Sequence, residues 1–292
     1  MEFFKESAFI LVATPLYAVV ILVEILLSRL FDRPLYSGRG VLENLWLTIL
    51  NIGLDILIRG MALLVLAFSY QHRVAGIEYA FLYWTALLLA EDFTYYWLHW
   101  VDHHCRLFWA VHVTHHSSEE FNLTVGFRSS VFQPLYRFVY FIPLALLGFR
   151  GIDIFLMYSA TQIYGILIHT QLVHRLGLLE YVLVTPSHHR VHHGSNIEYL
   201  DKNLGMVFIF WDKLFGTFVP EGKTVRYGLR ENLKAASLVK LVFHEWKSMW
   251  DDVKRSPRWS DKLQYVLGPP GWSHDKSKKT SKQLQLDANS KY

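Results

Sequence analysis

Long apolar segments with few charges constrain this chain more than any other feature of its sequence. The first runs from Ala8 to Leu30. At about 1.5 Å of rise per residue, a helix of this length can cross a hydrocarbon core about 30 Å thick. Four more segments follow, at about 45–70, 77–100, 131–149 and 152–173. Because these lengths suit helices, the pattern predicts an all-α, integral-membrane helical bundle with about four or five transmembrane helices.

The overall composition supports a membrane protein. Of the 292 residues, 52% are hydrophobic and 18% are charged, whereas soluble domains have about 45–50% apolar and about 25% charged residues. A disordered chain is excluded by the same figures. The formal charge of +4 is modest and gives no reason to expect a nucleic-acid partner. Cys105 is the only cysteine, so no intrachain disulfide can form.

The distribution of basic residues predicts how the bundle is oriented. Arg29, Arg33 and Arg39 lie around the loop after the first segment, whereas the loop before the third segment holds only Arg73. Short loops rich in Lys and Arg stay on the cytoplasmic side. An up-and-down path then places the histidine-rich segments on the cytoplasmic face, as a helical cap on a multi-pass protein. Either a bacterial inner membrane or an endoplasmic reticulum membrane fits this pattern.

The chain divides into three regions by composition. Residues 1–76 are expected to form N-terminal transmembrane helices, and residues 77–218 contain the histidine-rich segments. Residues 219–292 are polar and basic, and the tail from about residue 271 has almost no apolar content. Such a composition is typical of disorder, which we therefore expect for this tail.

Histidines form three closely spaced clusters. Twelve of the fifteen histidines lie between His99 and His193. The clusters, or boxes, are HWVDH at 99–103, HVTHH at 112–116 and HRVHH at 189–193. Helical positions i, i+3 and i+4 share one face, so each HxxHH box is expected to present three imidazoles to one point.

Residues that commonly begin and end helices flank the third box. Thr185 can serve as its N-cap, Pro186 fits the first helical position, and Gly194 can end the helix. Neutral imidazole binds zinc, copper, iron and nickel. Eight or more histidines on one membrane face indicate two metal ions. Because cysteine clusters, CxxCH and HExxH are absent, iron–sulfur centres, covalent haem and the corresponding zinc protease are excluded.

Several polar residues are candidates to support the metal ligands. Asp92, Tyr96, His99 and His103 follow one stripe of a helix, and ligand histidines usually bond a carboxylate or carbonyl through their second nitrogen. Asp201 is a further acidic candidate. His104 and His188 lie beside the boxes but outside their repeated pattern, so we expect them to support the ligands rather than bind metal. Candidates beyond this set are Glu119 and Glu120, while Asp55 and Arg59 can pair across one helical turn.

The histidine-rich segments resemble the fatty acid hydroxylase and sterol desaturase superfamily of membrane di-iron enzymes, and within it the alkylglycerol monooxygenase-like branch. The segments that carry this resemblance are DFTYYWLHWVDHH, FWAVHVTHHSSEEFNLT, IHTQLV, TPSHHRVHHGSN, LDKNLG and WDKLFGTF. It implies a di-iron catalytic domain over residues 77–218. The implied ligands are His99, His103, His112, His115, His116, His169, His189, His192 and His193.

The resemblance also implies a reaction. Two iron ions would use O₂ as co-substrate to hydroxylate or desaturate a C–H bond of a sterol, a fatty acyl chain or an ether lipid taken from the bilayer. No GxGxxG or haem motif is present, so the two electrons are expected from a separate donor. This donor would be a cytochrome b5-like protein, a ferredoxin-like protein or a reduced pterin.

Two other functions remain open from the sequence. A membrane zinc hydrolase would use fewer histidines and a carboxylate base, for which Glu119 or Glu120 is available. A non-enzymatic metal transporter or store would need ionisable residues through the membrane, and Asp55, Asp92 and Glu24 lie in apolar segments.

Overall fold

The computed structural model describes the backbone of residues 3–233 and 237–290, and side chains from residue 14 onward. Its regular elements in these ranges are helices, apart from one isolated bridge between Leu183 and Phe208. The predicted all-α class is therefore confirmed.

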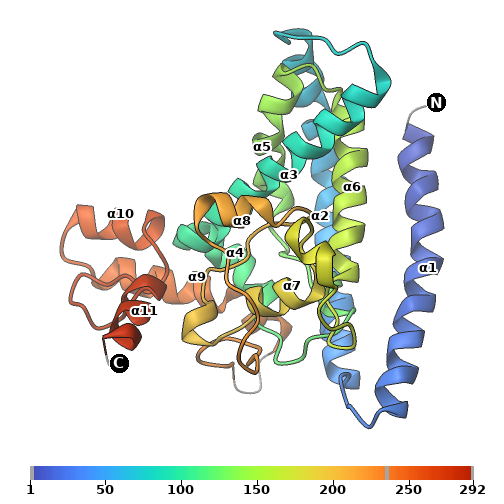
Figure 1. The fold of residues 1–292 in the computed structure, drawn as a ribbon. Coiled ribbons are helices and arrows are strands. Elements are labelled where there is room, and N and C mark those ends of the chain that lie inside the picture. The colour runs from blue at the N-terminus through green and yellow to red at the C-terminus, as the bar shows by residue number, and fades with distance from the viewer. Residues whose placement is uncertain (1–2, 234–236, 291–292) are drawn as a thin grey trace.

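Five long helices stand side by side and correspond to the five apolar segments (Figure 1). They are α1 (Phe3–Leu30), α2 (Gly38–Gln71), α3 (Ala80–His104), α5 (Pro134–Leu146) and α6 (Gly151–Leu167). A hydrophobic core joins α2, α3, α5 and α6, with Leu66, Leu87, Phe141 and Ile154 at its centre. The predicted pair of Asp55 and Arg59 forms within α2, with 2.7 Å between Oδ2 and Nη2.

Helix α2 presents an apolar surface to the outside of the bundle. Among the described residues, it is the helix long and apolar enough to cross a membrane. Only 11% of its most apolar stretch is buried inside the molecule, and Leu57 and Leu64 are 77% and 74% exposed. Exposed apolar patches of this kind mark surfaces that contact another apolar phase or partner.

Short helices and loops cover the base of the bundle. Helix α4 (Arg106–His116) follows α3 directly, and α7 (Pro186–His192) and α8 (Phe210–Phe215) lie nearby (Figure 1). Three 3₁₀ turns complete this layer: η1 (Val125–Phe127), η2 (Gly177–Tyr181) and η3 (Ile197–Tyr199). Glu24 of α1 ties the bundle to this layer, because its carboxylate accepts hydrogen bonds from Leu123 N (2.9 Å) and from the hydroxyl of Thr170.

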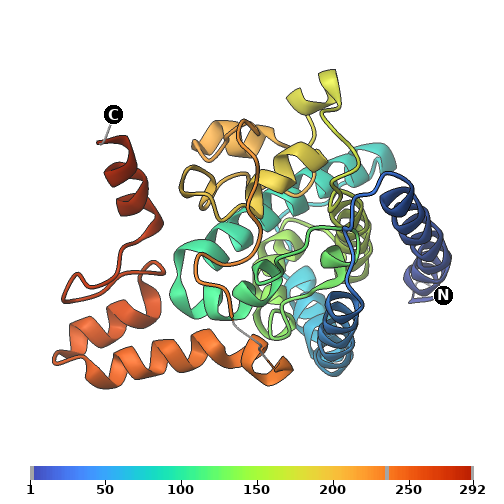
Figure 2. The ribbon, with the colours of Figure 1, turned by 90° about the horizontal axis from the view of Figure 1, so that it is seen from below.

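The C-terminal helices form an arm on the side of the base opposite to α1 (Figure 2). They are α9 (Leu238–Arg255), α10 (Trp259–Leu267) and α11 (Ser281–Asn289). Arg106 at the start of α4 holds α9 through Glu245 (2.7 Å), Asp252 (2.7 Å) and Ser248 (3.0 Å).

The structure differs from the disorder expected for the tail after residue 271, because α11 is an ordered helix in this region. Its N-cap residue Thr280 accepts a hydrogen bond from Gln283 N (3.3 Å) and returns one to the Gln283 side chain (2.9 Å). Gln285 then donates to the carbonyls of Ile197 and Leu200. Capping and these tertiary hydrogen bonds stabilise a helix that its low apolar content does not predict.

Candidate metal centre

The nine histidines predicted as ligands come together at the base of the bundle as two adjacent groups. In histidine group 1, five ligand nitrogens lie within 4.8 Å of one another, from His99, His103, His112, His116 and His192. Histidine group 2 meets the same limit with His115, His169, His189 and His193. The groups are in contact, because the rings of His116 and His193 stack with centroids 4.5 Å apart.

Each HxxHH box is divided between the two groups, which corrects the expectation of three imidazoles at one point. In α4, His112 and His116 belong to group 1 and His115 to group 2. Positions i+3 and i+4 are about 100° apart around a helix, so adjacent histidines can face different centres. Helix α7 repeats this division with the groups exchanged: His189 and His193 join group 2, and His192 joins group 1.

Local sequence explains why α7 forms where its histidines are needed. Thr185 is the N-cap and Pro186 occupies the first helical position, as predicted. His188 points back to accept a hydrogen bond from Thr185 N (3.3 Å), completing the first turn. The helix ends at His192. Just after this end, Gly194 N donates a hydrogen bond to the Val191 carbonyl.

One loop orients three of the group 1 rings. Residues 201–204 connect η3 to the segment before α8, and Asp201 and Asn203 adopt positive φ angles of 55° and 53°, which Asp and Asn tolerate better than most residues. The loop accepts hydrogen bonds from three Nδ1 atoms: the Asp201 carboxylate from His103 (3.1 Å), the Lys202 carbonyl from His192 (3.1 Å) and the Leu204 carbonyl from His99 (2.8 Å).

Two of the four group 2 rings are held in the same way by backbone carbonyls. His115 Nδ1 donates to the Arg128 carbonyl (3.0 Å), and His169 Nδ1 donates to the Gly165 carbonyl (2.7 Å). A carbonyl can only accept, so the proton of each ring is on Nδ1 and its Nε2 atom carries a lone pair.

The inward nitrogens fit a cation. His99 Nε2 lies 3.1 Å from His112 Nε2, and His169 Nε2 lies 2.9 Å from His189 Nε2. With metal–nitrogen bonds of about 2.1 Å, as for zinc, ligands at right angles are ~3.0 Å apart. The Nε2 atoms of His103 and His192 are buried with no hydrogen-bond partner. Such atoms are costly, and a metal ion inside group 1 would bind these lone pairs.

Burial favours the neutral form of several of these rings. Burial, together with neighbouring histidines, holds the pKa of His112, His116 and His192 well below the usual value. Burial likewise lowers the pKa of His115 to about 4. Neutral imidazole is the form that ligates metal ions, so both groups are ready to bind metal at neutral pH.

Comparison with known proteins agrees with this geometry. Residues 84–217 match the family model described as fatty acid hydroxylase, and this match includes all nine clustered histidines. This part of the chain is similar to fatty acid hydroxylases. The resemblance to the superfamily is thereby confirmed, and the alkylglycerol monooxygenases described next confirm the resemblance to that branch.

Several curated relatives also resemble the chain, over stretches of different length. An alkylglycerol monooxygenase of Homo sapiens is 40% identical over 194 residues, which cover 66% of this chain and 43% of the relative. An alkylglycerol monooxygenase of Danio rerio is 34% identical over 273 residues, which cover 90% of this chain and 60% of the relative. An ornithine lipid hydroxylase of Rhizobium tropici is 33% identical over 133 residues, which cover 45% of this chain and 40% of the relative.

The chain thus spans roughly two fifths to three fifths of the length of these relatives. No solved structure matches it.

Within the matched residues 84–217, Asp201 and Asp92 take different roles. Asp201 bonds His103 directly, as a supporting acid would. Burial alone would raise the pKa of Asp201, but the hydrogen bond from His103 lowers it below the usual value. Asp92 instead accepts from Val207 N (2.8 Å), Phe208 N (3.1 Å) and the Trp211 indole (3.0 Å). It anchors the segment after the 201–204 loop and so acts on the histidines indirectly.

His104 and His188 lie outside both histidine groups. His104 stacks on Trp100, with centroids 4.1 Å apart, and donates from Nδ1 to the Trp100 carbonyl. His188 caps α7, as described above, and its ring contacts Phe218. The structure therefore gives His188 a part in forming α7, whereas His104 packs at the edge of α3.

Two polar residues that contact the site were not predicted from the sequence. Asp102 is fully buried, 3.7 Å from His112 Nδ1, and accepts from Gln133 (2.9 Å) and Tyr136 (2.7 Å). Its position three residues after His99 could have identified it, since such residues share a helix face.

Arg128 was the second omission. Its guanidinium is 1% exposed and donates to the Thr114 carbonyl (2.8 Å), to Asn44 (3.0 Å) and to Ser117 (2.8 Å). It therefore joins the end of α4 to α2, while its own carbonyl orients His115. No local motif indicates such a role.

Proposed function

We propose that this chain is a membrane-bound, O₂-dependent lipid oxidoreductase, a hydroxylase, monooxygenase or desaturase, with one iron ion in each histidine group. The observation that supports it most directly is the pair of touching groups, in which neutral rings turn their Nε2 atoms toward a shared interior. The relatives named as alkylglycerol monooxygenases and an ornithine lipid hydroxylase point to a lipid substrate.

When bound, the two irons would supply the reduction of O₂ and the removal of hydrogen from a lipid C–H bond. The protein's own residues hold the metals and exclude water. Loop 201–204 and the carbonyls of Gly165 and Arg128 fix the ring orientations. The histidines act as ligands and not as acid–base groups, because burial keeps them neutral.

The reaction requires two electrons from outside the centre. We infer a separate donor, either a cytochrome b5-like or ferredoxin-like protein or a reduced pterin. The basic region after residue 219, which forms the α9–α11 arm, lies beside group 1 and is positioned to meet an acidic donor or anionic lipid headgroups.

The membrane arrangement follows from the exposed apolar faces. We infer that α1, α2, α3 and the α5–α6 hairpin lie in the bilayer, giving about four or five spans. Exposed leucines on α1 and α2 support this, including Leu22 (60%) and Leu57 (77%). The histidine-rich base then forms a cap on the cytoplasmic face, as the loop charges predict.

The alternatives fit the site less well. Zinc sites in proteins are usually four-coordinate, whereas group 1 alone offers five histidines. The candidate base Glu120 is turned toward Ser37 N (3.2 Å), outside both groups. The ionisable residues that a transporter would use are bonded within the protein: Asp55 to Arg59, Glu24 to Leu123 N and Asp92 to Val207 N.

Metal analysis tests the proposal. We expect about two irons per chain in detergent-purified protein from iron-supplemented cells, and O₂-dependent oxidation of added lipid with a reductant. The double variant His115→Ala/His192→Ala removes one ligand from each group and is expected to lose both metals after a chelator wash. His104→Ala, outside both groups, is the matched control. Bound zinc that resists iron supplementation would favour a hydrolase, and metal binding unaffected by the double variant would refute the ligand assignment.

A further inference from the structure

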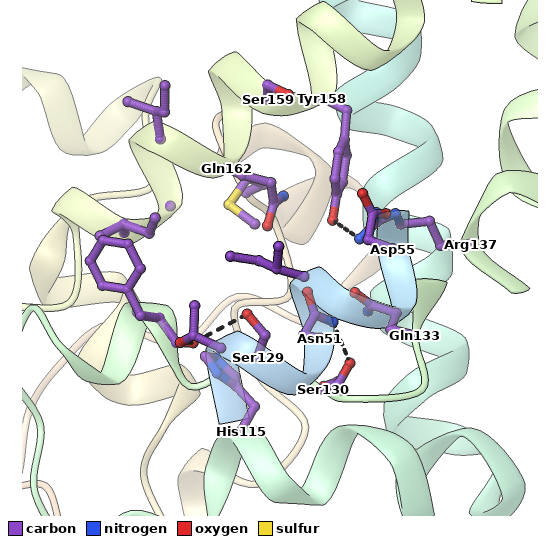
Figure 3. Close-up of a pocket in the computed structure, with 18 of the residues that line it drawn as sticks. Asn51, Asp55, His115, Ser129, Ser130, Gln133, Arg137, Tyr158, Ser159 and Gln162 are labelled. Carbon is purple, nitrogen blue, oxygen red and sulfur yellow. Dashed lines mark hydrogen bonds and ion pairs between the residues drawn. The ribbon is translucent and has the colours of Figure 1, made fainter. Parts of the chain in front are cut away.

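The bundle cavity, a space of about 300 Å³ between the bundle helices, opens onto both histidine groups. The charged side chains of its wall have partners within the protein. Arg137 donates to Asp55 and to the Tyr158 hydroxyl (3.0 Å), as Figure 3 shows, and Arg59 donates to Asp55 as well. Charges inside the bundle therefore balance one another, as buried charges must.

The surface of the arm carries cations that are not balanced in this way. Lys240, Lys247 and Lys254 recur every seven residues along α9 and so lie on one side of the helix. Within the described ranges Lys247 is in an ion pair with Asp251, whereas Lys240, Lys254 and Lys262 of α10 form none. The other acidic side chains of α9 and α10 are bonded to arginines. The arm therefore presents lysines that can meet an anionic surface.

Exposed apolar side chains form a stripe beside these lysines on α9. They are Val239, Phe243 and Trp250, and positions i, i+4 and i+11 share one face of a helix. The Lys254 ammonium lies over the Trp250 ring, 5.3 Å from its centre. Tryptophan and lysine side by side are typical of the boundary between a membrane and water.

Helix α10 repeats this pattern. Trp259, Leu263 and Leu267 recur every four residues, and Trp259 is 80% exposed. Lys262 lies over the Trp259 ring, 4.8 Å from its centre. The opposite side of α10 carries the buried Tyr265 and faces the rest of the arm. Figure 1 shows α10 on the side of α9 toward which the bundle helices rise.

Helix α9 meets the bundle near one end of the segment that we expect to cross the membrane. Val242 of α9 packs against Leu47 of α2. Helix α2 has 34 residues and is about 51 Å long, so a centred hydrocarbon core of about 30 Å leaves about 10 Å at each end. Leu47 lies ~14 Å from Gly38 at the start of α2. Trp46 beside it is half exposed, so the apolar outer face of α2 reaches the level of α9.

We propose that α9 and α10 lie along the cytoplasmic surface of the membrane, with their apolar stripes among the acyl chains and their lysines at anionic headgroups. Amphipathic helices with aromatic residues on one side and lysines beside them bind membranes in this way. A lipid surface explains the exposed apolar stripes and the level of α9, whereas an acidic partner protein explains only the lysines. The inference rests on the proposed function for the presence of a membrane, and adds a contact that the spanning helices do not make.

Depth measurements on the full chain in lipid nanodiscs test the proposal. A nitroxide label is attached to one cysteine in the Cys105→Ser background, and collisions with O₂ and with a water-soluble nickel complex give its depth. With Trp259→Cys or Leu263→Cys, we expect the label to lie about 5–10 Å below the headgroup level. Leu57→Cys on α2 is the reference for the bilayer. Leu286→Cys on α11 is the matched control, an exposed apolar position that we expect to stay in water.

A second measurement tests the lysines. Nanodiscs of phosphatidylcholine alone are compared with nanodiscs that also contain phosphatidylglycerol, using the label at residue 263. In the anionic nanodiscs, Lys254→Gln/Lys262→Gln is expected to lower the ratio of inserted to free arm about 5-fold per lysine, the usual attraction of a lysine to an anionic surface. Lys276→Gln/Lys282→Gln is the matched control, because it removes two exposed lysines outside α9 and α10.

Several results would overturn the proposal. If labels at 259 and 263 meet nickel as readily as the label at 286, while the label at 57 is in lipid, the arm does not contact the membrane and its surface is left for a protein partner. Insertion that ignores both phosphatidylglycerol and the lysine pair would refute the role of headgroup charge. Failure of the proposed function looks different. A label at 57 in water would refute the membrane arrangement, and an inserted arm without O₂-dependent lipid oxidation would refute only the oxidoreductase assignment.

Discussion

At the residue scale, the site depends on acceptors that are not themselves metal ligands. Loop 201–204 orients three rings of group 1, and only one of its three acceptors, the Asp201 carboxylate, is a side chain. Outer groups of this kind set ring orientation and ligand basicity. Metal affinity should therefore respond to Asp201 although it is absent from both histidine groups.

Replacing Asp201 with Asn is expected to weaken metal binding by group 1 about 10–100-fold, the usual effect of losing such a partner. Asn also tolerates the positive φ of 55° at this position, so the change isolates the carboxylate. Competition with a chelator measures the affinity. Asp275→Asn changes an exposed acid and serves as the control. Equal affinity in the two variants would contradict a role for Asp201.

The division of each box gives a second prediction at this scale. His116→Ala/His192→Ala removes two ligands from group 1 and none from group 2, so about one metal per chain should remain after a chelator wash. His115→Ala/His192→Ala removes the same number of histidines but affects both groups, and should retain almost none. Iron content per chain distinguishes them. Equal losses would show that the groups do not bind metals separately.

At the scale of elements, close packing between η1 and α6 positions His169. A Cβ atom on Gly126 would lie 2.9 Å from Ile166 Cα and 3.1 Å from His169 Nδ1. The first of these neighbours is backbone and cannot rotate away. Any larger side chain at residue 126 therefore has to separate η1 from α6, and with it move a group 2 ring.

Gly126→Ala is expected to destabilise the protein by about 1–3 kcal/mol, as overpacking does, and to reduce iron in group 2. Thermal unfolding in detergent and iron content measure the two effects. Gly53→Ala is the control, because nothing lies within 4 Å of a Cβ at that position. If both variants have the same unfolding temperature and the same iron content, the contact with α6 does not position His169.

Elements were more predictable from the sequence than their contacts. The apolar segments become α1, α2, α3, α5 and α6, and the caps of α7 are those expected at Thr185 and Pro186. These features follow from local periodicity and turn chemistry. The partition of His115 and His116 between two groups depends on how α4 is rotated against its neighbours, and Asp92 bonds a segment 115 residues away. Such relations arise only from tertiary packing.

At the scale of the whole molecule, the arm is joined to the bundle and the base by both polar and apolar contacts, the latter including Val242 of α9 against Leu47 and Val131. The arm is attached through Arg106, which is 3% exposed and bonded to Glu245, Ser248 and Asp252. Arm residues and group 1 histidines also line a second cavity on the side away from the bundle. The arm therefore forms part of the wall of this second cavity.

Arg106→Met should loosen the arm while leaving the metal ligands in place. Removing the guanidinium takes this partner away from the carboxylates of Glu245 and Asp252. Breaking a buried ion pair costs about 3–5 kcal/mol of folding free energy. We expect faster hydrogen exchange in α9–α11 with unchanged iron content. Lys247→Met breaks an exposed pair with Asp251 on the same helix and is the control. Unchanged exchange in Arg106→Met would show that other contacts hold the arm.

The unequal size of the histidine groups has a consequence for reactivity. Group 1 offers five histidine ligands and group 2 offers four. Two metal ions of equal coordination number would therefore differ by one in the number of coordination sites left free by the protein. Three of the four group 2 rings line the bundle cavity, against two of the five in group 1. The two halves of the centre are thus inequivalent: group 2 faces mainly the bundle cavity, whereas group 1 faces mainly the second cavity, which the arm lines.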